Sequence, residues 1–196
     1  MKKLMALIGI VVVMSSCNVA KQAAGGYQMT QCYYQFHSIS RLNLAGVDLQ
    51  NVTNPYSLKP AQLTALTAAF LRKEGSLLLT FTLNLDVTNP GQQPAFLTEL
   101  RYVLEIDGYE LTTGYLPKQI YIGSGQTVGM AIPMACDLKQ ALHNESLEAI
   151  KNLAFNFAGI GNGPSRVTVK LQPGFMFKNK TIASPVYFPV SFQLER

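Results

Sequence analysis

The chain has 196 residues, of which 48% are apolar and only 14% are charged, with a formal net charge of +5 and no tryptophan. This length allows one domain, or at most two small ones. Because a typical globular chain carries about 25% charged residues, the low charge argues against a disordered chain, a coiled coil and a highly charged nucleic-acid-binding protein.

The first sixteen residues have the pattern of a signal peptide. Two lysines precede an apolar run of eleven residues, Leu4 to Met14, which as a helix would rise only about 16 Å against a hydrocarbon core of roughly 30 Å. Two serines and Cys17 follow, where a cleavage site belongs. The segment resembles a bacterial lipoprotein signal, in which the cysteine is acylated and becomes the mature N-terminus, although Met14 stands where leucine is most typical.

Cys17 is the lipid-attachment residue that this resemblance implies. Its acyl chains, palmitate among them, would anchor the protein by burying CH₂ groups in a membrane at about 0.8 kcal/mol each. An ordinary secretory signal with an incidental cysteine is the alternative. Loss of Lys2 and Lys3 with the signal would lower the formal net charge from +5 to +3. Without a dense basic cluster, this charge is poor support for nucleic-acid binding.

Residues 17–30 are predicted to be the lipidated N-terminus and a flexible tether, because they are small and polar and include Gly25 and Gly26. Position 18 is asparagine rather than the aspartate that retains enteric lipoproteins at the inner membrane. We therefore expect a lipid-anchored protein of the cell envelope, located at the outer membrane and facing the periplasm.

Alternation of apolar and polar side chains predicts that residues 31–196 form a β domain. The most regular run starts at Leu79, where five apolar residues alternate with polar ones as far as Thr88. Asp107-Gly108 is a turn dipeptide, and Pro189, which cannot donate to a strand ladder, predicts an edge strand or a bulge. Strands are predicted over 79–88, 100–107, 109–113, 127–132, 167–171 and 186–194.

Helical character is clear only over Asp137 to Asn152, with an interruption near Asn144 to Ser146, where either end residue can cap the second part. The Ala-rich stretch 61–70 is interpreted as a turn leading into a strand, because Pro60–Leu66 is similar to Pro94–Leu100 and each follows a Val-Thr-Asn-Pro motif. The predicted fold class is therefore all-β: an antiparallel immunoglobulin- or fibronectin type III-like sandwich with one short helical insertion at about 137–152.

Three segments of this β domain resemble a known family. Phe81–Pro90 is an alternating strand that ends in Asn-Pro, Leu100–Gly108 ends in a short turn, and Gly114 begins the return strand. Together with Ser184–Val190, they are similar to the late-embryogenesis-abundant (LEA) type 2 domain, also called the water-stress and hypersensitive-response domain. The resemblance implies a seven-stranded sandwich and no catalytic residue. The extra Val-Thr-Asn-Pro motif at 52–55 departs from the family pattern and leaves the strand order of residues 31–75 open.

The chemistry-bearing residues do not converge on a catalytic or metal site. Cys32 and Cys136 are a candidate disulfide pair in an oxidising compartment, and two free buried thiols are the alternative. Neither has the spacing of a metal or redox motif. His37 and His143, which are the chain's two histidines, lack converging partners in the sequence and are expected at the surface or half-buried.

Three other motifs have ordinary structural explanations. In Asn54-Pro55 and Asn89-Pro90, asparagine caps the end of a strand and proline sets the turn, with ligand contact by these loops as the alternative. The glycines of 159–163 lack the Gly-Lys-Ser/Thr ending of a phosphate loop, so we expect a plain loop and no cofactor. The aromatic stretch from Cys32, which includes Tyr33 and Tyr34, is interpreted as a first strand or, if exposed, as a partner surface.

The sequence thus predicts a non-enzymatic cell-envelope lipoprotein, a β-sandwich that acts as a binding, structural or stress-protective module for an unknown ligand. A subunit of an envelope or surface protein assembly is the alternative. The expected partners are a membrane, through the N-terminal lipid, and an envelope protein. Nucleic acid is not expected, and the sequence identifies no small-molecule substrate.

Overall fold

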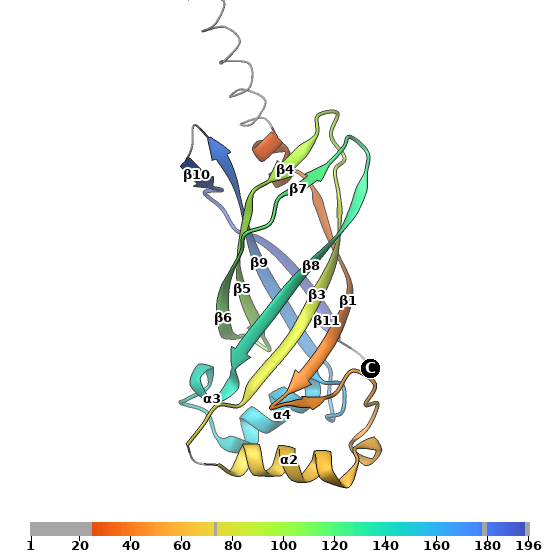
Figure 1. Ribbon diagram of the computed structural model, residues 1–196, viewed down its shortest axis with the longest axis vertical. Helices are drawn as coiled ribbons and strands as arrows, with labels where there is room; N and C mark the ends of the chain where they lie inside the picture. The colour runs from red at the N-terminus through yellow and green to blue at the C-terminus, as the bar shows by residue number, and fades with distance from the viewer. Residues whose placement is uncertain (1–24, 73, 178–179, 195–196) are drawn as a thin grey trace, which may run out of the picture.

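A computed structural model describes residues 25–72, 74–177 and 180–194 (Figure 1). The predicted signal peptide, Cys17 and residues 18–24 of the predicted tether lie outside them. The strands are β1 (Tyr33–Leu44), β2 (Val47–Asp48), β3 (Leu78–Thr88), β4 (Ala95–Leu97), β5 (Glu99–Ile106), β6 (Tyr109–Leu116), β7 (Ile120–Ile122), β8 (Thr127–Asp137), β9 (Ser165–Phe177), β10 (Lys180–Ala183) and β11 (Phe188–Leu194). The helices are η1 (Pro55–Ser57, a 3₁₀ turn), α2 (Pro60–Leu71), α3 (Leu138–Ala141) and α4 (Leu147–Phe157).

The strands form two main antiparallel sheets that pack face to face, which confirms the predicted all-β sandwich (Figure 1). One sheet has the order β2-β1-β3-β8, and the other has the order β10-β9-β5-β6 with β11 also paired to β9. The short strands β4 and β7 pair with each other. Among the described residues β11 pairs with β9 alone, with Pro189 opposite Lys170, so Pro189 lies on an edge strand as predicted.

Strand β3 lies inside the first sheet, between β1 and β8, and its register with β8 is regular throughout. It pairs with β8 without interruption from Leu78 opposite Asp137 to Thr88 opposite Thr127. Because side chains alternate across a strand, its apolar residues Leu79, Leu83 and Leu85 point inward and are fully buried. The strand predicted over 79–88 is confirmed.

Tyr102 of β5 joins the two sheets through the core. It is 8% exposed, and its hydroxyl donates to the backbone carbonyl of Pro133 in β8 at 3.2 Å. The ring lies over Gly114 of the neighbouring strand β6, where a Cβ atom would come within 2.1 Å of the ring carbons. A glycine is therefore required at this position by the close approach of the tyrosine ring.

The helices differ from the prediction of one short insertion at 137–152. Residues 60–71, interpreted from sequence as a turn leading into a strand, form the twelve-residue helix α2. Pro60 occupies the first turn of this helix, where its missing N–H costs nothing. The similar residues of Pro94–Leu100 form β4, which pairs with β7, and the start of β5. The insertion itself is two helices, of which α4 is capped by Ser146 and extends to Phe157.

The last part of the predicted tether is folded. Residues 25–30 are helical, and Met29 is fully buried. Added Cβ atoms at Gly25 and Gly26 would come within 2.4 Å of the rings of Phe96 and Phe175 respectively, so this short helix packs closely against the domain. The flexible-tether prediction is therefore wrong for these six residues.

The two Asn-Pro motifs have different roles. Asn89 is fully buried after β3, and its amide nitrogen lies 2.8 to 3.2 Å from the backbone carbonyls of Gln93, Ile122 and Gly123. Its side-chain oxygen accepts from the N–H of Gly91 at 3.0 Å, as predicted for a turn-forming asparagine. Asn54 is exposed and instead caps η1 by accepting from the N–H of Ser57 at 3.0 Å.

We expect Asn89→Ala to lower the free energy of unfolding by about 3 kcal/mol, because it leaves several buried backbone groups without a partner. Asn54→Ala, in the same dipeptide context, is the matched control and should cost about 1 kcal/mol or less, the usual value of an exposed cap. Urea unfolding of both variants provides the measurement. Equal losses of unfolding free energy in the two variants would contradict the conclusion that the Asn89 amide holds the loop at Gln93 to the loop at Gly123.

Candidate ligand-binding groove

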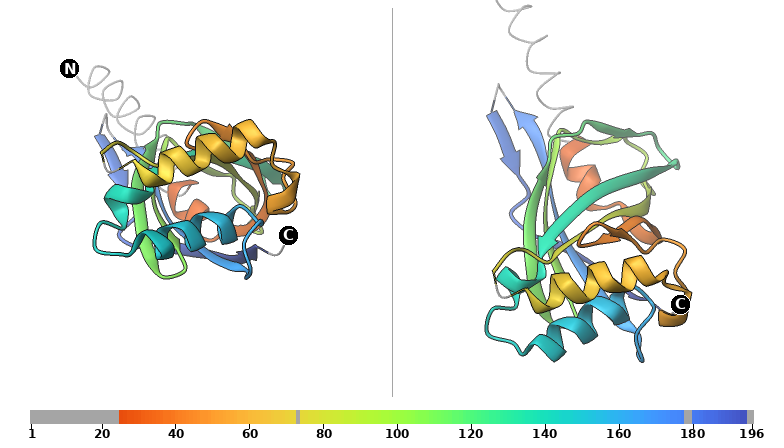
Figure 2. Two further views of the ribbon diagram at one scale, coloured as in Figure 1. Left: turned by 90° about the horizontal axis from the view of Figure 1, so that it is seen from below. Right: turned by 60° about the horizontal axis from the view of Figure 1, so that its bottom comes forward.

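The helices α2 and α4 lie side by side across one end of the sandwich (Figure 2). The N-terminal end of α2 is held by Gln62, whose side-chain oxygen accepts from the N–H of Lys59 at 2.9 Å. At the other end, the Lys139 ammonium of α3 donates to the carbonyls of Ala69 and Arg72 at 2.9 and 2.5 Å. A cation at a helix C-terminus satisfies otherwise unpaired carbonyls and interacts favourably with the helix dipole.

The helix α4 is amphipathic and uses one face to close the core. Ser146 caps it by accepting from the N–H of Ala149 at 3.1 Å. Phe157 is 1% exposed and packs on Phe81 of β3, with ring centroids 4.9 Å apart. Phe155, two residues earlier on the chain, instead meets Phe70 of α2 edge-to-face at 5.6 Å. This aromatic contact joins the two helices.

An apolar groove of about 530 Å³ runs between α2 and α4. Leu66 and Phe70, which are 1% and 7% exposed, form its buried side, whereas Leu63 and Leu71 are 52% and 67% exposed. The lining residues are Leu63, Leu66, Thr67, Phe70, Leu71, Leu147, Glu148, Lys151 and Phe155. Ligand sites in proteins are typically concave, mostly apolar and of this size.

The charge of the groove is balanced. Glu148 and Lys151 lie on its α4 side and form an ion pair at 2.7 Å, so they neutralise each other. The α2 side, from Pro60 to Leu71, contains no charged residue, although most of this helix is exposed. An exposed helix usually carries charge on its outer face, and an uncharged apolar surface indicates an interaction site. The groove is therefore suited to an uncharged, apolar ligand.

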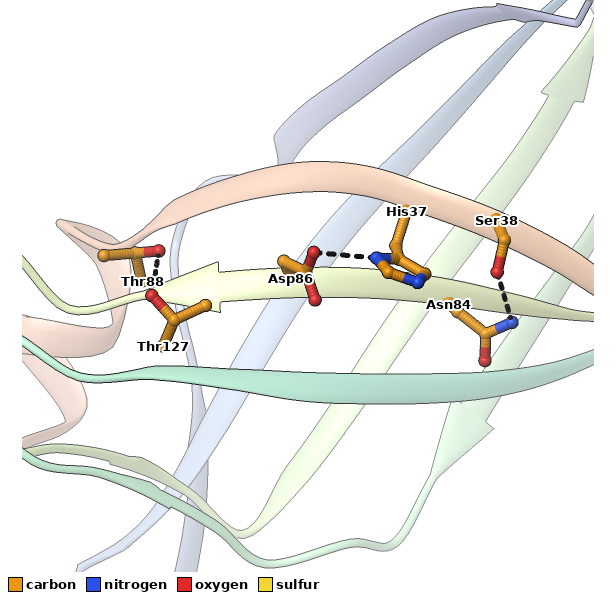
Figure 3. A network of polar contacts seen from close by, with 6 residues as sticks. All are labelled: His37, Ser38, Asn84, Asp86, Thr88 and Thr127. Carbon is orange, nitrogen blue, oxygen red and sulfur yellow. Dashed lines mark hydrogen bonds and ion pairs between the residues drawn. The ribbon is translucent and has the colours of Figure 1, made fainter.

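The two predicted surface histidines are exposed. His37 of β1 and Asp86 of β3 lie 2.9 Å apart, and their side chains are 62% and 41% exposed on the outer face of the sheet (Figure 3). They belong to a polar surface that includes Asn84 bonded to Ser38 (Figure 3). His143 lies 3.1 Å from the carbonyl of Gln140 on its own helical segment. A histidine and a carboxylate in open solvent have neither the desolvation nor the third group of a catalytic triad.

The candidate disulfide between Cys32 and Cys136 is not formed, because both thiols are free and buried. Cys136 is opposite Leu79 in the sheet, whereas Cys32 precedes Tyr33, which is opposite Thr88. Nine residues of β3 separate these two levels, about 30 Å at the usual rise per residue, and a disulfide requires Cα atoms within about 7 Å. Burial raises the pKa of Cys32 to about 11. Burial, together with the charge of Asp137, raises that of Cys136 to about 12.

Glu99, at the start of β5, is a buried carboxylate. It is 6% exposed, accepts from the Tyr115 hydroxyl at 3.1 Å and lies 3.5 Å from the Arg101 guanidinium. Its stem lies over Gly174, where an added Cβ atom would come within 2.5 Å. The hydrogen bond to Glu99 raises the pKa of Tyr115. This cluster joins β5, β6 and β9 and has a structural role.

The glycine-containing segment 159–163 is a loop that closes the end of α4, as the missing phosphate-loop ending predicted. The Asn156 side chain accepts from the N–H of Gly163 at 3.3 Å. Of the aromatic pair at the start of β1, Tyr34 is half-buried and donates to the carbonyl of Met29 at 3.0 Å, whereas Tyr33 is exposed. In the described ranges, no group of three or more His, Cys, Asp or Glu residues is placed to hold a metal, and no helix is long and apolar enough to cross a membrane.

Comparison with known proteins yields similarity of fold only. No family model and no curated protein matches the chain. Among solved structures, it is similar to a protein from Archaeoglobus fulgidus (12% identity, 63% of this chain and 88% of that chain, TM-score 0.39) and to one from Arabidopsis thaliana (11%, 60% and 70%, TM-score 0.41). A candidate LEA protein also matches (11% identity, 99% of this chain and 87% of that chain, TM-score 0.40). Because all three TM-scores are below 0.5, these similarities give no information about function.

The groove was missed in the sequence because one of its two walls was assigned to the wrong kind of element. With residues 61–70 interpreted as a turn and strand, Leu63, Phe70 and Leu71 could not be placed beside α4. One signal in the sequence favoured the helix: Pro60 is followed by eleven residues with four alanines, three leucines and no glycine, a composition with high helix propensity.

The two buried thiols predict a loss of stability in alkali. Below pH 9 the thiols are protonated in both states, but above it they ionise in the unfolded chain and stay protonated in the fold, whose pKa values are about 11 and 12. The free energy of unfolding should therefore fall between pH 9 and 11, by up to about 1.4 kcal/mol per pH unit for each thiol. Urea unfolding at several pH values across this range measures the free energy of unfolding. If a Cys32→Ala/Cys136→Ala variant lost the same free energy per pH unit as the wild type, the two thiols would not be the cause.

Proposed function

We propose that the protein is a non-enzymatic, lipid-anchored binding module of the bacterial cell envelope, and that it takes an apolar ligand in the groove between α2 and α4. The observation that carries the ligand assignment is an exposed groove lined by leucine and phenylalanine in which the charges are paired with each other. The signal pattern before Cys17 supports the anchor, and the asparagine at position 18 favours the outer membrane, facing the periplasm.

The groove supports binding rather than catalysis because its chemistry is that of hydrophobic contact. Burying apolar area contributes about 25 cal/mol per Å², and the Phe70 and Phe155 rings offer a surface for aliphatic or aromatic groups. The alternative of a subunit in an envelope assembly is favoured by one observation, the uncharged and exposed surface of α2. On that alternative, the apolar side chains of a partner protein would occupy the same groove.

Binding of the neutral apolar dye phenylnaphthylamine to residues 18–196 tests the groove. We expect saturable binding that Leu63→Asp weakens roughly tenfold or more, because a carboxylate at the rim of an apolar site loses well over 1.4 kcal/mol of binding free energy. Leu78→Asp, a change at an exposed leucine of β3 outside the groove (44% exposed), is the matched control and should leave the affinity unchanged. Equal affinities for the two variants would exclude the groove as the dye site.

The lipid anchor is tested by Cys17→Ser in the full chain expressed in a bacterium. We expect the wild-type protein to sediment with membranes and its N-terminal peptide to carry acyl chains, whereas the variant should be found in the soluble fraction. Fractionation and mass spectrometry of the N-terminal peptide measure this. A variant that stays bound to membranes and is cleaved at the same position would show that Cys17 is not the attachment residue.

A further inference from the structure

The end of the sandwich opposite the groove carries three tyrosines that are each about two-thirds exposed. Tyr27, Tyr33 and Tyr121 are 66%, 63% and 67% exposed, although tyrosine is usually at least half-buried. They come from the helical residues 25–30, the start of β1 and the short strand β7. Figure 1 shows these elements together at one end of the long axis, with α2 and α4 at the other.

Packing contacts place the three tyrosines around the point where the chain enters the domain. Gly25 packs against Phe96, and Phe96 is the cross-strand partner of Tyr121. Tyr33 follows the short helix after two residues and pairs with Thr88, the last residue of β3. The tyrosines therefore belong to one end of the fold, although they are up to 94 positions apart in sequence.

The same end carries an exposed aliphatic residue and two lysines. Gly26 packs against Phe175, whose cross-strand partner Ile182 is 43% exposed. Lys180 opens the same strand, β10, and Lys118 lies two residues before β7; both lysines are exposed. An amphipathic aromatic ring, an aliphatic side chain and cations on one surface match the layered chemistry of a bilayer interface with anionic headgroups.

The length of the chain before residue 25 limits how far this end can be from an anchor at Cys17. Seven residues lie between Cys17 and Gly25, so the eight steps from one Cα atom to the other span at most about 29 Å when fully extended. The strand β3 alone extends the domain by about another 35 Å toward the helices. The tyrosine-bearing end is therefore the part of the domain held closest to the membrane.

We propose that Tyr27, Tyr33 and Tyr121, together with Lys118 and Lys180, rest on the lipid surface and orient the domain upright. This inference depends on the lipid anchor of the proposed function and extends it from the acyl chains to the folded domain. The tyrosine rings enter the headgroup region and the lysines contact anionic headgroups. As a consequence, the groove between α2 and α4 opens away from the membrane.

The absence of tryptophan from the chain permits a site-specific test in the full lipidated protein. Tyr33→Trp and Tyr121→Trp each place one fluorophore on the proposed contact surface, and Tyr56→Trp places one at the helical end, where Tyr56 is 97% exposed. All three replace exposed rings, so the fold should be retained. The proteins are reconstituted in vesicles of phosphatidylethanolamine and phosphatidylglycerol with brominated acyl chains, which quench a tryptophan that enters the interface.

We expect blue-shifted and strongly quenched emission for tryptophan at positions 33 and 121, and solvent-like, unquenched emission at position 56. Adding Lys118→Glu and Lys180→Glu should move the emission at position 33 toward that at position 56, because each lysine near an anionic surface contributes about a fivefold preference for contact. Adding Lys59→Glu, a charge reversal at the helical end, should leave the emission at position 33 unchanged.

Three results would overturn the proposal, and they are distinguishable. If the N-terminal peptide carries acyl chains but tryptophan at position 33 is no more quenched than at position 56, the domain does not lie on the lipid surface and the anchor alone stands. If the peptide carries no acyl chains, the anchor fails and this inference fails with it. Quenching that is stronger at position 56 would show the reverse orientation, with the helical end on the membrane.

Discussion

The rest of the structure depends on the uninterrupted pairing of β3 with β8. Eleven consecutive residue pairs hold these strands in one register, and a slip of one residue would turn the buried leucines of β3, Leu79, Leu83 and Leu85, to the solvent. Because only one register buries these side chains, the positions of both ends of β3 are fixed. Leu78 lies beside the helices, and Thr88 lies at the end where the chain enters the domain. The two faces of the strand then differ, with Leu79, Leu83 and Leu85 inside and the polar surface of His37 and Asp86 outside.

A sandwich leaves its two ends open, and this protein closes them by different means. At one end, a buried asparagine amide joins two loops through three backbone carbonyls, and the helical residues 25–30 pack on the domain with Met29 fully buried. At the other end, α2 and α4 cover the core with aromatic and aliphatic side chains, of which Phe157 and Leu66 are almost completely buried. The groove between these two helices is the part of this closure that remains accessible to a ligand.

The sequence predicted long strands of both sheets, but it left the strand order of residues 31–75 open and did not predict what lies at the ends of the sheets. Alternation identified β3, β5 and β11 because every second residue must be apolar when one face of a sheet is buried. The similar segments beginning at Pro60 and Pro94 show the limit, because one forms a helix and the other forms a strand that pairs with β7. The candidate disulfide failed for a related reason, since spacing along the chain does not reveal that Cys32 and Cys136 lie at opposite ends of the same sheet.

The absence of charge along α2 has a further consequence for its own stability. A helix of twelve residues is marginal in isolation, and this one has no intrahelical ion pairs to support it. Its order depends on two buried side chains, Leu66 and Phe70, and on the carbonyl contacts of Lys139. Native-state hydrogen exchange should therefore find α2 opening at lower free energy than β3, so that the groove is dismantled by local unfolding while the sandwich remains intact. A ligand that bridges α2 and α4 would raise the free energy of this local opening, and its binding would slow hydrogen exchange in α2.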